Sequence, residues 1–310
     1  MSTPGLTPSG LSMTPGLHAA TALPAPHRYL VLLRELLESA GVMAFRRVRR
    51  GRDQVRRDYD LGTWRAVLES RPWLRHATLR DYVLTTDESD RRLIVAKMDD
   101  RLVRVRQRAY YEYRLRLLQD VLAQYAGDQP ALVELGCGAG VNLLSLHLAG
   151  RWASLNGFDI SANAIQAASE AARHFALEHV RFARLDLTDA NDPSFARLRD
   201  RTVFTYYCLE QLKYSTAAVI EHLIRAGVRR AIHIEPTTEL LRFWSLMDWV
   251  TYAYIRRQDY QDNLLRTLRG FATQGRIRSV DVKRLYYSPT PRNDPVVVCW
   301  EPTGPSGGSR

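Results

Sequence analysis

One glycine-rich run constrains the fold more than any other feature of the sequence. Residues 131–135 form a short apolar segment, and Gly136, Gly138 and Gly140 follow it at alternate positions. Such a segment is typical of a buried strand, and glycine allows both positive φ and a close approach of a ligand to the backbone. Residues 139–149 continue as a helix with free N–H groups at its start. The run therefore predicts a strand–loop–helix unit that binds a nucleotide-type ligand at a strand end.

Strands and helices continue to alternate from residue 130 onward. The sequence pattern predicts strands near residues 131–135, 154–159, 180–185, 202–207 and 229–235, and helices near 139–149, 162–176, 193–198 and 215–226. A helical pattern follows over 237–272, and two extended runs, 278–287 and 295–301, close the chain. This order predicts an α/β fold with a doubly wound, mostly parallel sheet.

An acidic residue in the first predicted strand narrows the choice of ligand. Glu134 would repel a pyrophosphate, but it suits the cationic methionine end of S-adenosylmethionine (SAM). The spacing of Gly136, Gly138 and Gly140 also differs from the dinucleotide fingerprint G-x-G-x-x-G. The run E-L-G-C-G-A-G from Glu134 to Gly140 resembles the first motif of the class I SAM-dependent methyltransferases.

The resemblance covers about residues 130–301. It implies a seven-stranded Rossmann-like sheet with an antiparallel last strand, SAM as the cofactor, and a substrate lid formed by the helices of 237–272. The residues of the first motif that are expected to contact the cofactor are Glu134, Gly136, Cys137, Gly138, Gly140 and Asn142.

A carboxylate ends the second predicted strand about 20 residues after the glycine loop. Asp159 can accept hydrogen bonds from both ribose hydroxyls, because neighbouring parallel strands end at the same edge of the sheet. The alternative role is a helix N-cap, but Ser161 already fits that position. Ile160 would then pack on the adenine ring.

The third predicted strand is followed by a second acidic residue. In the methyltransferase family an acid at the position of Asp186 commonly receives the adenine amino group, and the N–H of the next residue, Leu187, reaches a ring nitrogen. Asp189 is close enough to compete for this role, and an ordinary turn carboxylate is the alternative.

The fourth predicted strand ends in Tyr206, Tyr207, Cys208, Leu209 and Glu210. The resemblance implies that this segment passes beneath the sulfonium and opens the substrate pocket. It lacks the N/D-P-P-Y sequence of the DNA amino-methylating enzymes. Tyr207 and Glu210 are therefore catalytic candidates, with Glu210 binding a cationic group or acting as a base. A carboxylate at the start of a surface helix is the alternative for Glu210.

The fifth predicted strand contributes His233 and Glu235, which share one face because side chains alternate along a strand. Glu235 lies at the carboxyl edge and is the stronger catalytic candidate. His233 lies two residues deeper, and a packed, hydrogen-bonded histidine is the alternative for it. Glu210 and Glu235 are expected to bracket an amine, guanidinium or imidazole and to bind its charge or remove its proton.

The predicted domains follow from these patterns and from a Pro/Gly/Ser/Thr-rich start of the chain. They are a flexible tail (1–26), a helical N-terminal region (27–127), a SAM-binding domain (128–302) and a second flexible tail (303–310). The N-terminal region includes a long helix from about Ser89. One of Tyr110 and Tyr113 in this helix is expected to reach the cofactor.

The basic charge of the chain raises the question of an acidic partner. The formal charge is +11, and residues 46–57 hold seven arginines, which fits an anion-binding patch or a solvated surface. Only three of the 44 basic residues are lysine. Because such a bias can come from a GC-rich genome, nucleic acid is disfavoured as a partner.

The sequence therefore predicts a cytoplasmic methyltransferase of natural-product metabolism that acts on a small molecule or a peptide, with nitrogen as the preferred acceptor. An RNA methyltransferase and a non-catalytic scaffold are the alternatives. Three widely spaced cysteines indicate a reducing compartment, and no apolar run is long enough to span a membrane. No metal site is expected, and a homodimer is left open.

Overall fold

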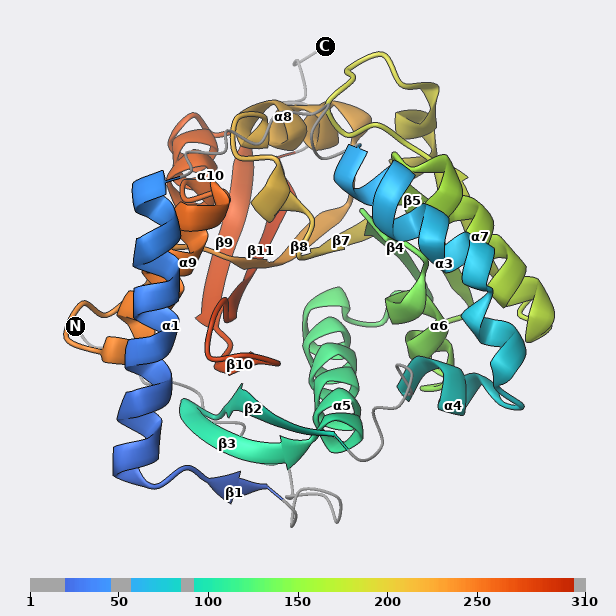
Figure 1. Cartoon of the computed structure of the whole chain (residues 1–310). Helices are drawn as coiled ribbons and strands as arrows, with labels where there is room; N and C mark the ends of the chain where they lie inside the picture. The colour runs from blue at the N-terminus through green and yellow to red at the C-terminus, as the bar shows by residue number, and fades with distance from the viewer. Residues whose placement is uncertain (1–19, 46–56, 85–91, 304–310) are drawn as a thin grey trace.

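A seven-stranded sheet forms the centre of the computed structural model, which describes residues 20–45, 57–84 and 92–303. The strand order is β6-β5-β4-β7-β8-β11-β9 (Figure 1). The bounds are β4 (Ala131–Leu135), β5 (Ser154–Asp159), β6 (Val180–Arg184), β7 (Thr202–Tyr206), β8 (Arg230–Pro236), β9 (Ile277–Arg284) and β11 (Pro295–Pro302). The first five strands pair in parallel, and β11 runs antiparallel to β8 and β9. The predicted doubly wound, mostly parallel sheet is confirmed.

Helices cover both faces of this sheet because neighbouring residues of the buried strands point to opposite sides. Leu132 packs in one apolar cluster and Val133 in another. The first cluster includes side chains from α5 (Gln107–Ala126), α6 (Val141–His147) and α7 (Ala162–His174). The second includes side chains from η4 (Pro193–Leu198), α8 (Thr216–Ala226) and α10 (Leu264–Thr273). The helices on the two faces of the sheet leave the carboxyl ends of its strands uncovered.

The N-terminal region differs from its prediction. The long helix expected from about Ser89 is wrong over 93–106, where β2 (Leu93–Met98) and β3 (Arg101–Arg106) form a hairpin, and α5 starts only at Gln107. In β3 buried and exposed positions largely alternate, which is a strand pattern. Asp99 and Asp100 turn the hairpin with φ of 49° and 60°, a conformation that aspartate tolerates better than most residues.

This hairpin belongs to a second sheet, which joins distant parts of the chain. Its order is β1-β3-β2-β10, with β1 at Thr21–Ala22 and β10 at Tyr287–Ser288. The predicted run 278–287 is therefore two strands in different sheets. The flexible tail predicted for 1–26 is wrong from β1 onward, and its first 19 residues lie outside the described part of the chain. In the second predicted tail, only Thr303 is described, and its N–H donates to the Arg276 carbonyl.

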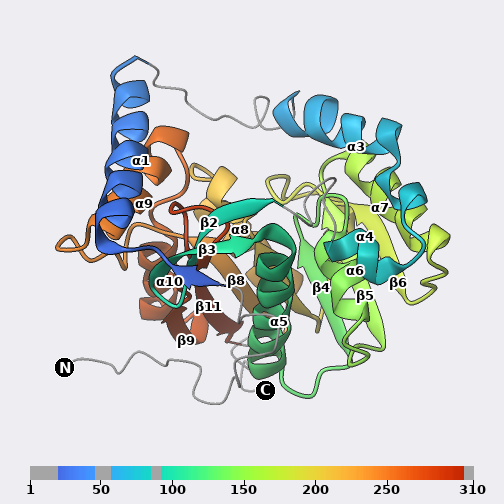
Figure 2. The same cartoon turned by 60° about the horizontal axis from the view of Figure 1, so that its bottom comes forward.

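Two helical layers flank the sheet on opposite sides of the molecule. Helix α1 (Ala25–Phe45) lies beside α9 (Leu246–Gln258), and the α-helix α3 (Arg65–Ser70) lies on α7 (Figures 1 and 2). Leu32 of α1, Leu102 of β3 and Val250 of α9 form a small apolar cluster of their own. The remaining short elements are η2 (Arg57–Trp64), η3 (Pro72–Arg75), α4 (Leu79–Leu84) and η5 (Leu209–Gln211).

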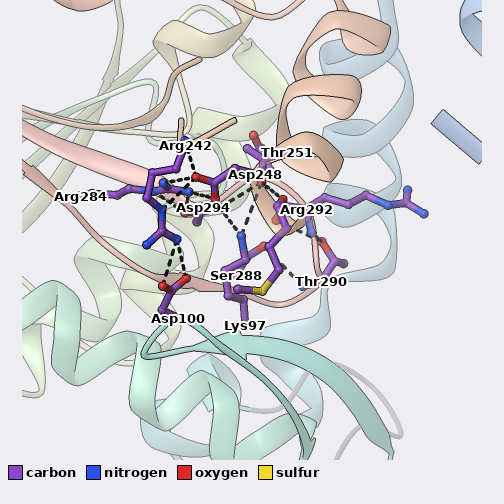
Figure 3. Close-up of polar contacts among 12 residues, drawn as sticks. Lys97, Asp100, Arg242, Asp248, Thr251, Arg284, Ser288, Thr290, Arg292 and Asp294 are labelled. Atoms are coloured by element: carbon purple, nitrogen blue, oxygen red, sulfur yellow. Dashed lines mark hydrogen bonds and ion pairs between the residues drawn. The ribbon is translucent and has the colours of Figure 1, made fainter. Parts of the chain in front are cut away.

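A buried network of charges holds the second sheet against α9 and β9 (Figure 3). Lys97 donates to Asp294 at 2.5 Å, and the side chains of both residues are fully buried. Arg284 donates to Asp294 at 2.9 Å and to Asp248 at 2.6 Å. Arg242 donates to Asp248 at 3.2 Å and to Asp100 of the hairpin turn at 3.0 Å. Burial alone would raise the pKa of Asp294, but the charges of Lys97 and Arg284 lower it to about 2.

Candidate functional site

A cavity of about 480 Å³ opens at the carboxyl ends of β4, β5 and β7, where open α/β sheets bind their ligands. Its walls come from four parts of the chain: the glycine loop, the ends of β5 and β6, the segment after β7, and the N-terminal elements η2 and α5. The predicted site residues that line it are Gly136, Cys137, Gly138, Asn142, Asp159, Ile160, Asp186, Leu187, Tyr206, Tyr207 and Glu210.

The loop after β4 requires glycine at its three predicted positions. Gly136, Gly138 and Gly140 have φ of 73°, 51° and 77°. A Cβ at Gly136 would lie 2.2 Å from the Cys208 sulfur, and one at Gly138 would lie 2.6 Å from the Trp64 ring. Gly140 is predicted to contact the cofactor, but it lies outside the cavity wall.

Asp159 joins the glycine loop to the start of α7. Its Oδ2 accepts the Gly138 N–H and its Oδ1 accepts the Ser161 N–H, both at 2.9 Å. Burial raises the pKa of this carboxyl above its ordinary value. A carboxylate has about four acceptor positions, so Asp159 retains capacity for hydroxyls in the cavity.

At the end of β6, the residue that lines the cavity is Asp186 and not Asp189, the alternative. Asp186 lines the cavity, and its Oδ1 accepts the N–H of Thr188 at 2.9 Å and the Thr188 hydroxyl at 2.7 Å. Asp189 is exposed and accepts the N–H of Asn191 at 3.0 Å. Leu187 and Ile160 also line the cavity and add apolar surface to it.

Glu134 lies behind the cavity wall, where it is fully buried. Its Oε1 accepts the side-chain amide of Asn142 at 2.7 Å, and its Oε2 has no partner among the described residues. Burial raises the pKa of this carboxyl to about 8. The orphaned oxygen is an unused acceptor directly behind the glycine loop.

Helix α5 turns a different face to the cavity from the one predicted. Tyr110 is fully buried, and Tyr113 donates to Asp99 in the hairpin turn at 3.0 Å. Neither tyrosine lines the cavity, which does not favour the expected cofactor contact by one of them. Tyr111 and Arg114, three residues apart on the helix, line it instead.

Arg114 is the one arginine that the cavity wall contains among the described residues. Its guanidinium lies 5.8 Å from the Tyr111 ring centre and 5.3 Å from that of Tyr206. Its Nε is buried and has no hydrogen-bond partner in the part of the chain that the structure describes. Such a cation with unused donor capacity is suited to a carboxylate.

The element η2 covers the glycine loop; the predicted helical region 27–127 includes it, but the sequence pattern did not indicate that it lines the site. Tyr59, Asp60 and Trp64 line the cavity. Asp60 is fixed to the start of α7, because its Oδ1 accepts the Ser161 hydroxyl at 2.5 Å and its carbonyl accepts the Asn163 amide at 2.9 Å. The arginine-rich run predicted at 46–57 lies outside the described residues except for Arg57, where η2 begins.

The segment after β7 forms the other end of the cavity. Tyr207 has a φ of 53°, a strained conformation that is common at functional sites. Its hydroxyl donates to the Asn293 carbonyl at 2.8 Å. The side-chain amide of Asn293 donates to Glu210 Oε2 at 3.0 Å. Glu210 is 5% exposed and still reaches the cavity surface, beside the rings of Tyr206 and Tyr207.

The predicted pair of Glu210 and Glu235 is not a feature of the cavity wall. Glu235 is fully buried and lies outside the wall. It accepts the backbone N–H groups of Cys208 at 2.9 Å and of Glu210 at 3.2 Å. Burial raises its pKa to about 7 in spite of these bonds. Glu235 therefore anchors the backbone that presents Glu210 and does not bracket a ligand with it.

His233 is a packed core residue. It is fully buried, its Nε2 accepts the Trp300 indole N–H at 2.9 Å, and its Nδ1 lies 3.0 Å from the Thr205 hydroxyl. Burial lowers its pKa to about 3, which keeps the ring neutral. The catalytic role predicted for His233 is corrected, because the cavity wall does not include it.

Neither a metal cluster nor a membrane-spanning helix occurs in the described part of the chain. Over residues 20–45, 57–84 and 92–303, no group of three or more His, Cys, Asp or Glu side chains is placed to hold a metal ion. No helix in these ranges is both long and apolar enough to cross a bilayer.

Comparison with known proteins gives one family match. Residues 128–226, which span the glycine loop through α8, match a family model described as a methyltransferase domain. No curated protein matches the chain in sequence.

Solved structures with a similar fold share little sequence with the chain. Magnesium protoporphyrin IX methyltransferase from Synechocystis PCC 6803, with bound S-adenosylhomocysteine (SAH), is 18% identical; the match covers 63% of this chain and 86% of that chain, with a TM-score of 0.45. The N-methyltransferase NodS from Bradyrhizobium japonicum WM9 is 15% identical, covering 62% and 87%, with a TM-score of 0.44. Values this low carry no inference about activity.

The strand order, the glycine loop and the family match identify a class I SAM-dependent methyltransferase domain in this chain. Its cofactor is SAM, and the residues present fit that group. Side-chain-free glycines cradle the cavity, Glu134 has a buried acceptor without a partner among the described residues, and Arg114 likewise has a buried donor without one. An ammonium and a carboxylate, the two charged ends of an amino acid, are the chemical counterparts of these groups.

Proposed function

We propose that the protein methylates a nitrogen of a small molecule or a peptide in specialised metabolism. The observation that carries this proposal is Glu210, a nearly buried carboxylate on the wall of an aromatic cavity. Aromatic faces and a carboxylate both attract cations. A nitrogen acceptor, which is cationic before or after methylation, gains from both.

The proposed cofactor contacts follow the order of groups along the cavity. Asp159 binds the ribose hydroxyls, and Asp186 with the Leu187 N–H binds the adenine edge. At the amino-acid end, Glu134 serves the ammonium together with the glycine loop, and Arg114 binds the carboxylate.

The reaction requires little chemistry from the protein itself. SAM supplies a methyl group that is already activated by a sulfonium, so alignment of the acceptor accounts for most of the catalysis. Glu210 holds the acceptor nitrogen and takes up the proton that it loses. The strained Tyr207 and the anchored segment after β7 keep this carboxylate in place.

Incubation of the protein with methyl-labelled SAM and separate pools of amines, phenols and thiols tests the proposal. The label is expected in the amine pool, and Glu210→Gln is expected to lower kcat/KM by about 100-fold, as for loss of a general base. Label confined to the phenol or thiol pool would contradict nitrogen as the acceptor.

Cofactor binding is expected to release protons near neutral pH. Glu134 has a pKa of about 8 without ligand, so it is mostly protonated at pH 7, and a nearby ammonium favours its ionised form. SAH should therefore bind more tightly as the pH rises from 6 to 8. Calorimetry in two buffers of different ionisation enthalpy measures the proton release, which Glu134→Gln should abolish. An equal release from this variant would rule out Glu134 as the source.

A further inference from the structure

The turn before β11 connects the cavity wall to the buried charge network. On one side, Asn293 contacts both proposed acceptor-site residues: its carbonyl accepts the Tyr207 hydroxyl at 2.8 Å, and its amide donates to Glu210 at 3.0 Å. On the other side, the next residue, Asp294, accepts from Lys97 and Arg284 (Figure 3). Two consecutive residues thus belong to two different polar clusters.

The network fixes the conformation of this turn. Asn293 has a φ of 61°, which costs free energy for a residue with a Cβ, although less for asparagine than for most. Asp294 is held by Lys97 at 2.5 Å, by Arg284 at 2.9 Å and by the Thr251 hydroxyl at 3.1 Å, all in the protein interior. Because Asp294 cannot move without breaking these contacts, the adjacent Asn293 keeps its left-handed conformation.

The orientation of the Asn293 amide follows from its partner. Only the NH₂ group can donate to a carboxylate, so Nδ2 faces Glu210. The backbone of Glu210 is also anchored, since its N–H donates to Glu235 at 3.2 Å.

We infer that Asn293 is a positioning residue that determines specificity: it holds the Glu210 carboxylate turned to the cavity, and so selects a cationic nitrogen over a neutral oxygen at the acceptor end. This inference rests on the proposed function, because it requires that Glu210 faces the transferred group. The amide would not contact the acceptor and acts through Glu210 alone.

Two ligands of known chemistry can measure the attraction of the acceptor end for a cation, and this requires no identified acceptor. SAH lacks the methyl group. Sinefungin carries an amine-bearing carbon in place of the methylated sulfur, so it places an ammonium where the methyl group of SAM lies. The ratio of the two Kd values therefore measures the attraction of the acceptor end for a cation, and their shared parts cancel.

The variant Asn293→Gly removes the amide and keeps the turn, because glycine accepts a φ of 61° and retains the carbonyl that receives the Tyr207 hydroxyl. Wild type is expected to bind sinefungin about tenfold more tightly than SAH. Asn293→Gly and Glu210→Gln should each remove most of this preference, a reduction of about fivefold to tenfold, because a hydrogen bond to a charged group is worth at least that much. The Kd of SAH should change by less than about twofold.

Ala176→Gly is the matched control, since Ala176 also has a positive φ of 54° and lies beyond the far end of α7; it should leave the ratio unchanged. Asn293→Ala repeats the test with a second truncation, and thermal unfolding verifies that each variant folds. A preference lost in Glu210→Gln but kept in both Asn293 variants overturns the inference and leaves the proposed function standing. Failure of folded wild type to bind SAH overturns the proposed function itself.

Discussion

Replacement of Lys97 by methionine is expected to lower the free energy of unfolding by about 3–5 kcal/mol, because it leaves a negative charge in excess in the interior, where Asp294 then shares Arg284 with Asp248. Lys97 is fully buried and donates to Asp294. Denaturant unfolding of the purified variant measures the effect. The double variant with Asp294→Asn should lose less than the sum of the two single changes, since the groups are in direct contact.

The control for this experiment is the exposed pair of Arg34 and Glu38 on α1, whose side chains are 79% and 40% exposed. Arg34→Ala should change stability by less than about 1 kcal/mol. If Lys97→Met costs no more than this control, the buried network does not hold the second sheet in place.

Gly136→Ala is expected to have the largest effect on cofactor binding. The added Cβ would lie 2.2 Å from the Cys208 sulfur, and the residue would retain a φ of 73°. Left-handed strain of about 1–2 kcal/mol adds to overpacking of about 1–3 kcal/mol. The clash displaces the segment between Tyr207 and Glu210, so SAH binding should weaken by more than about tenfold, as measured by calorimetry.

Gly127→Ala is a control for alanine at a positive φ outside the cavity wall. Gly127 has a φ of 62°, and a Cβ added there would meet no atom within 4 Å; this variant should show only the strain and bind SAH normally. The second-site change Cys208→Gly should restore part of the affinity to Gly136→Ala. Equal SAH affinity in Gly127→Ala and Gly136→Ala would show that close packing of the loop on Cys208 is unimportant.

The central sheet could be predicted because its signals are local. Buried parallel strands read as short apolar runs, and each predicted strand from 131–135 to 229–235 agrees with the structure to within one residue. Of the two closing runs, 295–301 agrees with β11 to within one residue, whereas 278–287 merges β9 with β10. The hairpin at 93–106 was harder to distinguish from a helix, because its apolar residues also fit a helical spacing. In addition, the turn at Asp99 and Asp100 lacks the glycine that is usual in hairpin turns.

Site residues were predictable where a motif ties them to a strand end. Asp159 ends a strand of the sheet, Asp186 and Glu210 each follow one, and all three line the cavity. Trp64 and Arg114 could not be found in this way, because their place depends on how η2 and α5 pack on the sheet. Asn293 lies in a turn whose position is set by a charge network between distant segments, which no local pattern records.

Glu235 illustrates a different limit. Strand alternation correctly placed it at the carboxyl edge, but an edge residue can face the cavity or the backbone of the next loop. The backbone N–H groups after β7 needed an acceptor, and this carboxylate supplies it for Cys208 and Glu210. The satisfaction of buried backbone donors decided its role.

Calorimetric titration of the 310-residue chain with SAH tests the central claim most directly. One site per chain is expected, and Asp159→Ala should weaken binding by at least about tenfold, because Asp159 accepts the Gly138 N–H and is proposed to bind the ribose. Asp189→Ala, which removes an exposed carboxylate from the adjacent turn, should bind as wild type does. Absence of binding to folded wild type, or an Asp159→Ala variant that binds equally well, would contradict the account.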